Sequence, residues 1–316
     1  STREEAMEET LKMLGVYARI MRDILALPVV EGEKTEGERF PGADNTYACE
    51  TMMSDGKALQ AGTSHFLGQN FAKAFDIKFQ NRNGDLEYAW TTSWGVSTRL
   101  IGAIIMTHSD DDGLILPPRV APVKAAILPI STNEEKIDST LLPRAMELSS
   151  ELDRSLGGRF AFVDRQFYLR PGDRFFQHLQ KGVPLRVELG EKDLAAGTAR
   201  VVRRDTGEKM DIPLENLASK VPSLLEEIQS SLFNKALSFR RENTVEVASY
   251  EEMKKVLEEK GGFVETWFAG SRDDEKKIKE ETGATARCMP VDREEPGTCF
   301  YTGKPGARKV IFAKAY

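Results

Sequence analysis

The stretch "GVSTRLIGAIIM", residues 95–106, places an arginine at the start of a run of apolar residues. Arg99 comes directly before Leu100 to Met106, a run that predicts one helix. A guanidinium at a helix start can fork onto phosphate oxygens or lie flat on a purine ring. The positive end of the helix adds to the attraction for an anion. A second interpretation stays open, in which Arg99 forms a surface ion pair with one of the aspartates at 110–112.

The segment "ALQAGTSHFLGQNF" gathers hydrogen-bonding side chains between apolar residues. If it is a strand, alternation puts Gln60 and Gly62 on one face and Thr63 and His65 on the other. That spacing would line a small polar pocket. The alternative is a turn between a strand and a helix, with Thr63 or Ser64 as the N-terminal cap of the helix.

The sequence contains none of the common motifs for metal binding, for nucleophilic catalysis or for phosphate-binding loops. The three histidines have no metal-ligand spacing, and no GxSxG, HExxH, GxxxxGK[ST] or GxGxxG motif is present. The three cysteines form no CxxC motif, which fits a reducing compartment and gives no disulfide framework. For Cys288 and Cys299 we expect buried structural thiols, with a degraded metal site as the alternative.

Charge and hydropathy restrict the partners. The net charge of −6 gives no global basic field, so a nucleic-acid site must be a local patch. No apolar run reaches about 18 residues, so we expect no membrane span.

The elements that must position these residues fall into three groups. A chain of 316 residues suggests two or three domains. Residues 1–120 begin with a helix that should end at Pro28, and they continue as antiparallel strands with a hairpin at Asn83-Gly84. Strands and helices alternate in residues 121–222, which predicts a small α/β domain. A long helix then leads into a third unit, residues 223–316.

The two stretches described first, taken in their order along the chain, resemble class II prolyl-tRNA synthetases of the archaeal and eukaryotic type, which some bacteria and organelles also use. The likeness rests on "DGKALQAGTSHFLGQNFAKAFDIKF" and "TTSWGVSTRLIGAIIMTHSDDDGLILPPRVAP". Further matches are "KGVPLRVELGEKDL", "EETGATARC" and the terminal "VIFAKAY". The whole chain resembles the C-terminal two-thirds of such an enzyme.

The resemblance implies a fold class and an activity. The fold would be α/β (α+β), with part of a class II antiparallel-sheet catalytic domain, then an α/β anticodon-binding domain, then a small α/β C-terminal domain. The activity would be that of a proline–tRNA ligase, which activates L-proline with ATP and transfers it from prolyl-adenylate to tRNA(Pro). Such chemistry needs positioning and charge stabilisation more than acid–base groups, which suits the absence of a catalytic triad.

The resemblance also implies roles for particular residues. "GVSTR" resembles the third class II signature, so Arg99 would be the catalytic, ATP-binding arginine. Packing of Leu100 to Met106 would then hold its helix in place. Gln60 and Thr63 would bind the nucleotide and its Mg²⁺. The proline pocket would be lined by His65, Ser97 and Trp94.

In the second domain, Arg186 and Lys192 match positions that read anticodon bases. Arginine and lysine suit the O6 and N7 acceptors of guanine, and RNA loops are also read by stacking. Without the family, Lys192 could equally be a solvated loop lysine.

Three departures from the family pattern set further expectations. The N-terminal third is absent, and with it the first two class II signatures, so we expect this chain alone to be incomplete. Leu179 stands where the family often has a glutamate, which puts one anticodon contact in doubt. The four C-terminal positions that often carry zinc cysteines are Ala269, Asp274, Cys299 and Thr302. One thiolate cannot hold a structural zinc, so we expect a zinc-free form.

The leading hypothesis is therefore a proline–tRNA ligase that uses ATP and Mg²⁺. We expect a homodimer in the cytoplasm, or alternatively in an organelle matrix or stroma, with no membrane or DNA partner. The rival hypothesis is a non-catalytic fragment or relative that binds tRNA or serves as an assembly module.

Overall fold

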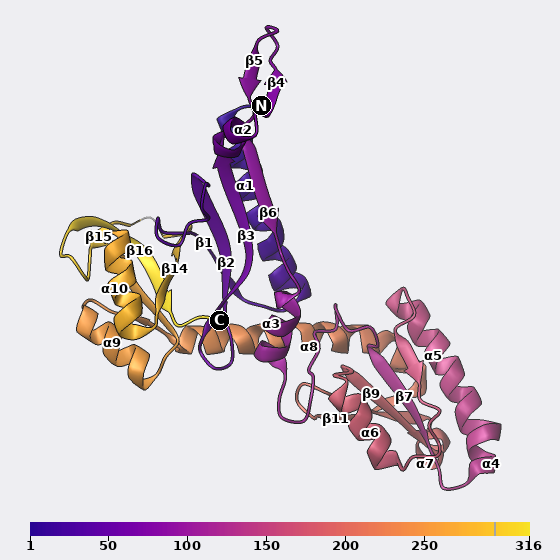
Figure 1. Ribbon diagram of the computed structural model, residues 1–316. Coiled ribbons are helices and arrows are strands. Elements are labelled where there is room, and N and C mark those ends of the chain that lie inside the picture. Colours follow the sequence, from indigo (N-terminus) through magenta and orange to yellow (C-terminus); the bar gives the residue numbers. More distant parts are fainter. Residues whose placement is uncertain (294) are drawn as a thin grey trace. The chain divides into compact units, whose positions relative to one another are not determined.

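The computed structural model describes residues 1–293 and 295–316, which fold into two compact units (Figure 1). The first unit comprises Ser1–Asp23, Leu27–Thr107 and Ala236–Tyr316, and the second comprises Ile24–Ala26 and His108–Lys235. The mixed α/β class with antiparallel strands agrees with the fold class expected from the sequence.

A nine-stranded sheet forms the centre of the first unit. Its order is β12-β13-β16-β14-β1-β2-β3-β6, and β15 pairs with β16. The first half consists of β1 (Val29–Glu33), β2 (Asn45–Met52), β3 (Ala58–Gly68) and β6 (Thr91–Gly95). The second half consists of β12 (Thr244–Glu246), β13 (Phe263–Phe268), β14 (Thr285–Pro290), β15 (Gly297–Thr298) and β16 (Pro305–Ala313). All these pairings are antiparallel except β12 with β13.

The two halves of this sheet meet where β1 pairs with β14. Gly32 of β1 is required there, because a Cβ atom would lie 2.6 Å from the sulfur of Cys288 and 2.8 Å from the carbonyl oxygen of Met289. Residues 1–120 and 223–316, expected as separate domains, thus contribute strands to one sheet. The domain boundaries expected from the sequence stay a prediction.

Helix α1 (Arg3–Arg19) covers one face of β3 and β6 (Figure 1). It begins at the expected capping box, in which Thr2 and Glu5 bond each other's backbone amides. Its buried residues recur at helical spacing and include Ala6, Thr10 and Leu14. A π-helical turn, η1 (Ile20–Ile24), follows, and the helical segment ends before Pro28, as predicted.

The remaining elements of the first unit are short. They are α2 (Asn70–Ala74), β4 (Lys78–Gln80), β5 (Leu86–Tyr88), α3 (Arg99–His108), α9 (Tyr250–Glu259) and α10 (Arg272–Thr282). The predicted hairpin is confirmed, since β4 and β5 pair around Gly84, whose φ of +91° suits glycine. Helices α9 and α10 flank the C-terminal strands (Figure 1).

Helix α3 is less buried than its sequence suggested. Ala103 and Ile104 are buried, but Ile101 is 61% exposed and Ile105 is 40% exposed. The packing of Leu100 to Met106 that was expected to hold the helix in place is therefore found for part of the run only. Only one side of the helix has a packing partner among the described residues.

The second unit is built on a five-stranded sheet of order β11-β10-β9-β7-β8. The strands are β7 (Ala125–Ile130), β8 (Ala161–Val163), β9 (Leu185–Gly190), β10 (Thr198–Arg203) and β11 (Lys209–Pro213). The helices are α4 (Glu134–Lys136), the π-helical η2 (Ile137–Leu141), α5 (Leu142–Leu156), α6 (Pro171–Gln180), α7 (Glu191–Ala195) and the first part of α8 (Leu214–Glu242). Parallel pairing of β7 with β8 and β9 fits the alternating strand–helix pattern of the sequence.

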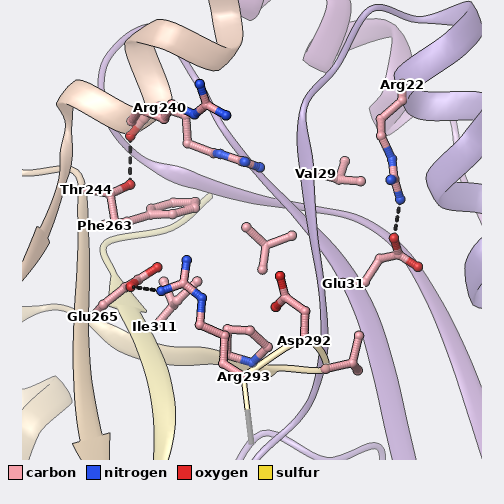
Figure 2. A pocket seen from close by; sticks show the side chains of 14 residues that line it. Arg22, Val29, Glu31, Arg240, Thr244, Phe263, Glu265, Asp292, Arg293 and Ile311 are labelled. Atoms are coloured by element: carbon pink, nitrogen blue, oxygen red, sulfur yellow. Dashed lines mark hydrogen bonds and ion pairs between the residues drawn. The ribbon is translucent and has the colours of Figure 1, made fainter. Parts of the chain in front are cut away.

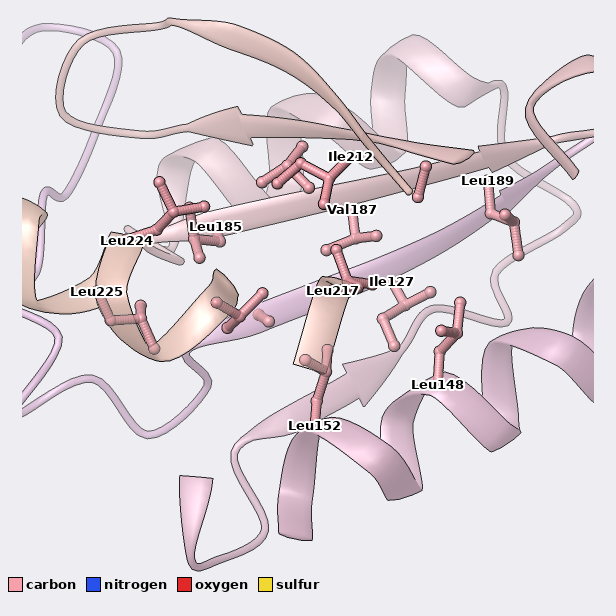
Figure 3. Packing of buried hydrophobic residues seen from close by; sticks show 14 of the residues in the cluster. Ile127, Leu148, Leu152, Leu185, Val187, Leu189, Ile212, Leu217, Leu224 and Leu225 are labelled. Carbon is pink, nitrogen blue, oxygen red and sulfur yellow. The ribbon is translucent and has the colours of Figure 1, made fainter. Parts of the chain in front are cut away.

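An aliphatic core holds this sheet to its helices (Figure 3). Ile127 and Val187 project from the strands, Leu148 and Leu152 from α5, and Leu217 from α8. All five side chains are fully buried. Burial of one such side chain contributes roughly 1.5–3 kcal/mol, so this layer helps to hold the sheet to its helices.

His108 makes the second unit sensitive to acid. Its Nε2 lies 3.1 Å from the carbonyl oxygen of Leu25, which can only accept, so the ring donates from Nε2. Burial lowers the pKa of His108 from 6.5 to about 4, against the raising effect of that hydrogen bond. The folded state therefore favours the neutral imidazole.

We expect the unfolding free energy to fall as the pH drops from 6.5 towards 4, because the unfolded histidine binds a proton that the folded one resists. The contribution lost is on the order of 3 kcal/mol. Calorimetry of the wild type and His108→Gln, whose amide can still donate to Leu25, would measure it. Carboxylates also titrate in this range, so the difference between the two proteins is the quantity to follow. An identical pH dependence would contradict the assignment.

No helix in the described parts of the chain has the length and apolar character needed to cross a membrane.

Candidate active site

A β-bulge in β3 brings the polar side chains of that strand to one face of the sheet. Cys49 of β2 pairs with Gly62, but the next residue, Glu50, pairs with Gln60, so Ala61 is an extra residue on β3. The bulge shifts the alternation by one residue. Gln60 therefore shares a face with Thr63 and His65, which pair with Ala48 and Thr46 of β2. The prediction that strict alternation puts Gln60 on the other face is wrong.

The opposite face of β3 belongs to α1. The Ser64 hydroxyl donates to the carbonyl oxygen of Thr10 in α1, at 2.7 Å. A Cβ atom at Gly62 would lie within 3.5 Å of Tyr17, Met21 and Val96. Ser64 is thus a packing residue, and the alternative in which residues 63 and 64 cap a helix is wrong because both lie inside β3.

Trp94 lies on that same α1 side. It pairs in register with Ser64 across β3 and β6, and directly paired residues point to one face of a sheet. His65, by contrast, pairs with Ser93, and Thr63 pairs with Gly95. The structure therefore does not bring Trp94 to His65, and the expected place of Trp94 in a proline pocket stays a prediction. The family resemblance identifies Trp94 as a candidate, and the strand register shows on which face of the sheet its side chain lies.

Arg99 lies against the bulge. Its Nη1 donates to the carbonyl oxygen of Gln60 at 3.2 Å, and its backbone amide donates to the Ser97 hydroxyl at 3.3 Å. Arg99 is exposed, and no carboxylate of the described residues pairs with it. Asp110, considered as a surface partner, is instead bound by Arg204 at 2.6 and 2.9 Å. The guanidinium is thus held by one bond and has donors left for an anion.

His65 is half-buried and fixed by a hydroxyl. Its Nδ1 lies 3.0 Å from the Thr46 hydroxyl, which also accepts from the backbone amide of Phe40. The Phe40 ring lies 4.8 Å from the imidazole, centroid to centroid. Burial lowers the pKa of His65, so the ring is neutral at pH 7. A neutral imidazole between an aromatic ring and polar strand residues suits recognition of a small ligand.

A buried ion cluster supports this face from the neighbouring strand. Glu50, fully buried and paired with Gln60, binds the Lys34 ammonium at 2.7 Å and the Arg287 guanidinium at 3.0 and 3.1 Å. Two cations surround one carboxylate, so the cluster carries a surplus positive charge. That surplus favours an anionic ligand on the Gln60 side of the sheet.

Sequence reasoning missed several of these residues. Thr46, Phe40 and Lys34 lie in or beside a polar segment that has no periodic pattern, and their contacts join residues far apart in the chain. In the sequence, that segment shows only a polar composition with an aromatic residue. Such a composition does not distinguish a functional site from a solvent-exposed loop.

Arg186 and Leu179 line one cavity of about 400 Å³ in the second unit. Arg186 contacts Glu188 through Nε and Nη2, both at 2.9 Å, and its guanidinium lies 4.4 Å from the centroid of the Phe175 ring. The expected anticodon-binding residue Arg186 and the departure from the family pattern at Leu179 therefore lie at the same cavity. Arg204 donates to the carbonyl oxygen of Leu179, so the backbone there is also fixed.

Lys192 lies elsewhere, in α7, just beyond the end of β9. Five residues lie between it and Arg186, and the strand that carries Arg186 ends before the helix that carries Lys192 begins. Lys192 is exposed, and it forms no ion pair within the described residues. The structure does not bring the two residues into one cavity.

Three of the four positions compared with zinc cysteines do lie together. The backbone amides of Ala269 and Thr302 donate to the sulfur of Cys299 at 3.3 and 3.4 Å. Asp274 instead closes a capping box with Ser271 at the start of α10. Burial raises the pKa of the Cys299 thiol, but hydrogen bonds from Thr302 and Ala269 outweigh it and lower the pKa overall. One sulfur does not fit the ligand set of a structural zinc site.

The antiparallel sheet has an exposed arginine with donors free to bind an anion, and an α/β unit follows it in the chain. This is the arrangement of a class II aminoacyl-tRNA synthetase. Residues 124–224 match the family model "Anticodon binding domain", and residues 250–316 match "Prolyl-tRNA synthetase, C-terminal".

Known proteins extend the likeness to the whole chain. Proline–tRNA ligases of Flavobacterium johnsoniae and Prosthecochloris aestuarii are 51% and 50% identical over the full chain, which spans 64% and 66% of their lengths. A crystal structure of the prolyl-tRNA synthetase of Cryptosporidium parvum, complexed with L-proline and AMP, aligns with a TM-score of 0.92 at 40% identity. That alignment covers all of this chain and 68% of the other. The chain belongs to the prolyl-tRNA synthetase family.

Proposed function

We propose that this chain is part of a proline–tRNA ligase. The observation that carries the proposal is the bulged strand β3, which directs Gln60, Thr63 and His65 to one face, with Arg99 at its edge. The C. parvum relative was crystallised with L-proline and AMP, the amino acid and the nucleotide product of this reaction. The chain spans about two-thirds of the length of its relatives, so the activity belongs to the chain extended to that length.

In the proposed reaction, an oxygen of the proline carboxylate attacks the α-phosphorus of ATP and pyrophosphate leaves. The 3′-terminal hydroxyl of tRNA(Pro) then attacks the carbonyl carbon of prolyl-adenylate and releases AMP. Arg99 stabilises the charge that develops on the phosphoryl oxygens. Gln60 and Thr63 hold the nucleotide, and His65 and Ser97 line the proline pocket.

Magnesium, when bound with ATP, offsets the charge of the phosphates. The side-chain oxygens of Gln60 and Thr63 are suitable hard ligands beside the phosphate oxygens. Glu50 is not available, since Lys34 and Arg287 already bind both of its oxygens.

The second unit supports tRNA(Pro) as the partner, through its match to an anticodon-binding domain. Arg186 and Lys192 would read different anticodon bases, given their separation along β9 and α7. A homodimer is supported by exposed apolar side chains in the first unit, among them Trp94, Val96 and Ile101. Buried free cysteines suit a reducing compartment such as the cytoplasm.

Proline-dependent exchange of pyrophosphate into ATP tests the activity. The chain extended to the length of its relatives should catalyse exchange with proline and not with alanine at equal concentration. If that protein binds tRNA(Pro) without exchange, the rival hypothesis of a tRNA-binding or assembly module holds instead. Binding of ATP that is indifferent to a proline-adenylate analogue would indicate a general nucleotide-binding module.

Arg186→Ala should reduce kcat/KM for tRNA(Pro) about tenfold. It should also reduce the difference in kcat/KM between tRNA with the matched anticodon and tRNA with a mutated anticodon. The guanidinium is already oriented by Glu188 and Phe175, so its loss removes a preorganised contact. Exchange without tRNA should not change. Arg200→Ala is a matched control, because Arg200 is an exposed arginine of the same sheet paired with Asp211. Equal effects of both substitutions would rule out a role for Arg186 in reading the anticodon.

A further inference from the structure

Four arginines line a second cavity in the first unit, away from the residues discussed so far. The cavity measures about 630 Å³, a size typical of small-molecule sites. Arg22 and Glu31 form one wall, and Arg240, Glu265 and Arg293 form the opposite wall (Figure 2). The fourth arginine, Arg241, also lines it.

This cavity lies on the α1 side of the sheet. Glu31 pairs with Cys49, which pairs with Gly62, and Gly62 points to α1. Gln60, Thr63 and His65 point to the other side. A ligand in the cavity would therefore not compete with ATP or proline at the proposed active site.

The charges in the cavity do not balance. Arg22 is paired with Glu31, and Arg293 is paired with Glu265 at 2.9 Å. Arg240 and Arg241 remain, and neither forms an ion pair within the described residues. Asp292 is the one further carboxylate among the described residues of the lining, which together have a surplus of one positive charge.

Arg240 carries the least compensated charge. Its Nη1 is buried and has no hydrogen-bond partner among the residues that the structure describes. Burial lowers the pKa of Arg240, and the charge of Arg241 lowers it further. A buried donor without a partner costs about 1–3 kcal/mol, and more for a charged group. Such a group is stabilised when an anion enters.

We propose that this cavity binds the phosphate group of a small molecule. A phosphate offers three oxygens, so it can accept from Arg240 and Arg241 together and still bond a third arginine. A carboxylate offers two oxygens and a smaller charge, so it matches three arginines less well than a phosphate does. Phe263, Val29 and Ile311 also line the cavity and give it apolar surface next to the arginines, which suits the carbon skeleton of a phosphate ester.

Calorimetric titration of the chain extended to the length of its relatives tests the site, with inorganic phosphate, ribose 5-phosphate and ribose as probes. We expect saturable phosphate binding that a proline-adenylate analogue does not displace. Arg240→Gln should weaken it about tenfold or more, since it removes a charged donor. Arg272→Gln is the matched control, an exposed arginine of the same unit outside the cavity. Ionic strength is held constant because charges are screened by salt.

Comparison of the titrations with phosphate, ribose 5-phosphate and ribose identifies the source of the phosphate. Tighter binding of ribose 5-phosphate than of phosphate, with none of ribose, assigns a phosphate ester, whereas equal binding assigns the free anion. Absence of binding by both phosphates, or equal weakening by Arg240→Gln and Arg272→Gln, overturns the proposal.

Arg240→Met provides a readout that does not depend on an affinity. It should raise the melting temperature without ligand, because it removes a half-buried charge whose Nη1 has no partner among the described residues. It should also abolish the rise in melting temperature that phosphate gives the wild type. A variant that keeps the phosphate-induced rise would contradict the site.

Discussion

Arg99→Ala should lower proline-dependent ATP–pyrophosphate exchange by a factor on the order of 10³, the usual effect of removing a charge-stabilising donor from a transition state. The reason is geometric. The guanidinium is anchored by one bond to Gln60 and keeps its remaining donors for the phosphates. The loss should appear in kcat more than in KM for ATP, because the charge that Arg99 offsets is greatest in the transition state.

Two variants separate this role from a structural one. Arg99→Lys should recover only part of the rate, since an ammonium cannot donate in the two-pronged geometry of a guanidinium. Arg82→Ala removes another exposed arginine of the first unit, in the turn between β4 and β5, and should not change the rate. The melting temperature of Arg99→Ala should match the wild type, because the side chain is exposed. Full activity in Arg99→Ala would exclude the catalytic role.

Glu50→Ala should reduce the unfolding free energy of the first unit by about 3–5 kcal/mol, because it leaves Lys34 and Arg287 buried without a counter-charge. All three side chains are less than a tenth exposed. Urea denaturation would measure the change, and the exchange rate should fall with it because Glu50 pairs with Gln60 in the sheet.

Glu226→Ala is the comparison for that experiment. It breaks an ion pair with Arg119 in which both side chains are at least 40% exposed, and such pairs contribute about 0–1 kcal/mol. Replacing Lys34, Glu50 and Arg287 together by apolar residues of similar volume should restore much of the stability. If Glu50→Ala and Glu226→Ala cost the same, the buried cluster does not stabilise the sheet.

The general fold could be predicted because its signals are local. The capping box at Thr2 and Glu5, the turn at Asn83-Gly84 and the alternating elements of residues 121–222 each depend on neighbours in sequence. The single sheet shared by residues 29–95 and 244–313 could not be predicted in this way. It depends on the pairing of Gly32 with Pro290, which no periodicity in either segment specifies.

Residues of the candidate site can be proposed from the sequence, but the face of the sheet that each one occupies cannot. The motifs indicate Gln60, Thr63, His65 and Arg99, but the bulge at Ala61 decides that the first three share a face. A bulge changes register by one residue without a strong composition signal. The same register places Trp94 on the α1 side of the sheet. The motif match alone had suggested a place for Trp94 beside proline.

Helix α3 shows how apolar composition can mislead. A run from Leu100 to Met106 reads as a core helix, but Ile101 and Ile105 are exposed in this chain. Apolar residues four apart on one side of a helix indicate a surface that packs, and they do not say whether its partner belongs to the same part of the chain.

The shared sheet has a consequence for synthesis on the ribosome. Strand β1 finds its outer neighbour only in β14, and Glu50 finds one of its two cations only at Arg287, 237 residues further along. Until those residues leave the ribosome, β1 has an open edge of unpaired backbone groups, the kind of edge at which chains aggregate. A polypeptide released before β14 keeps that open edge.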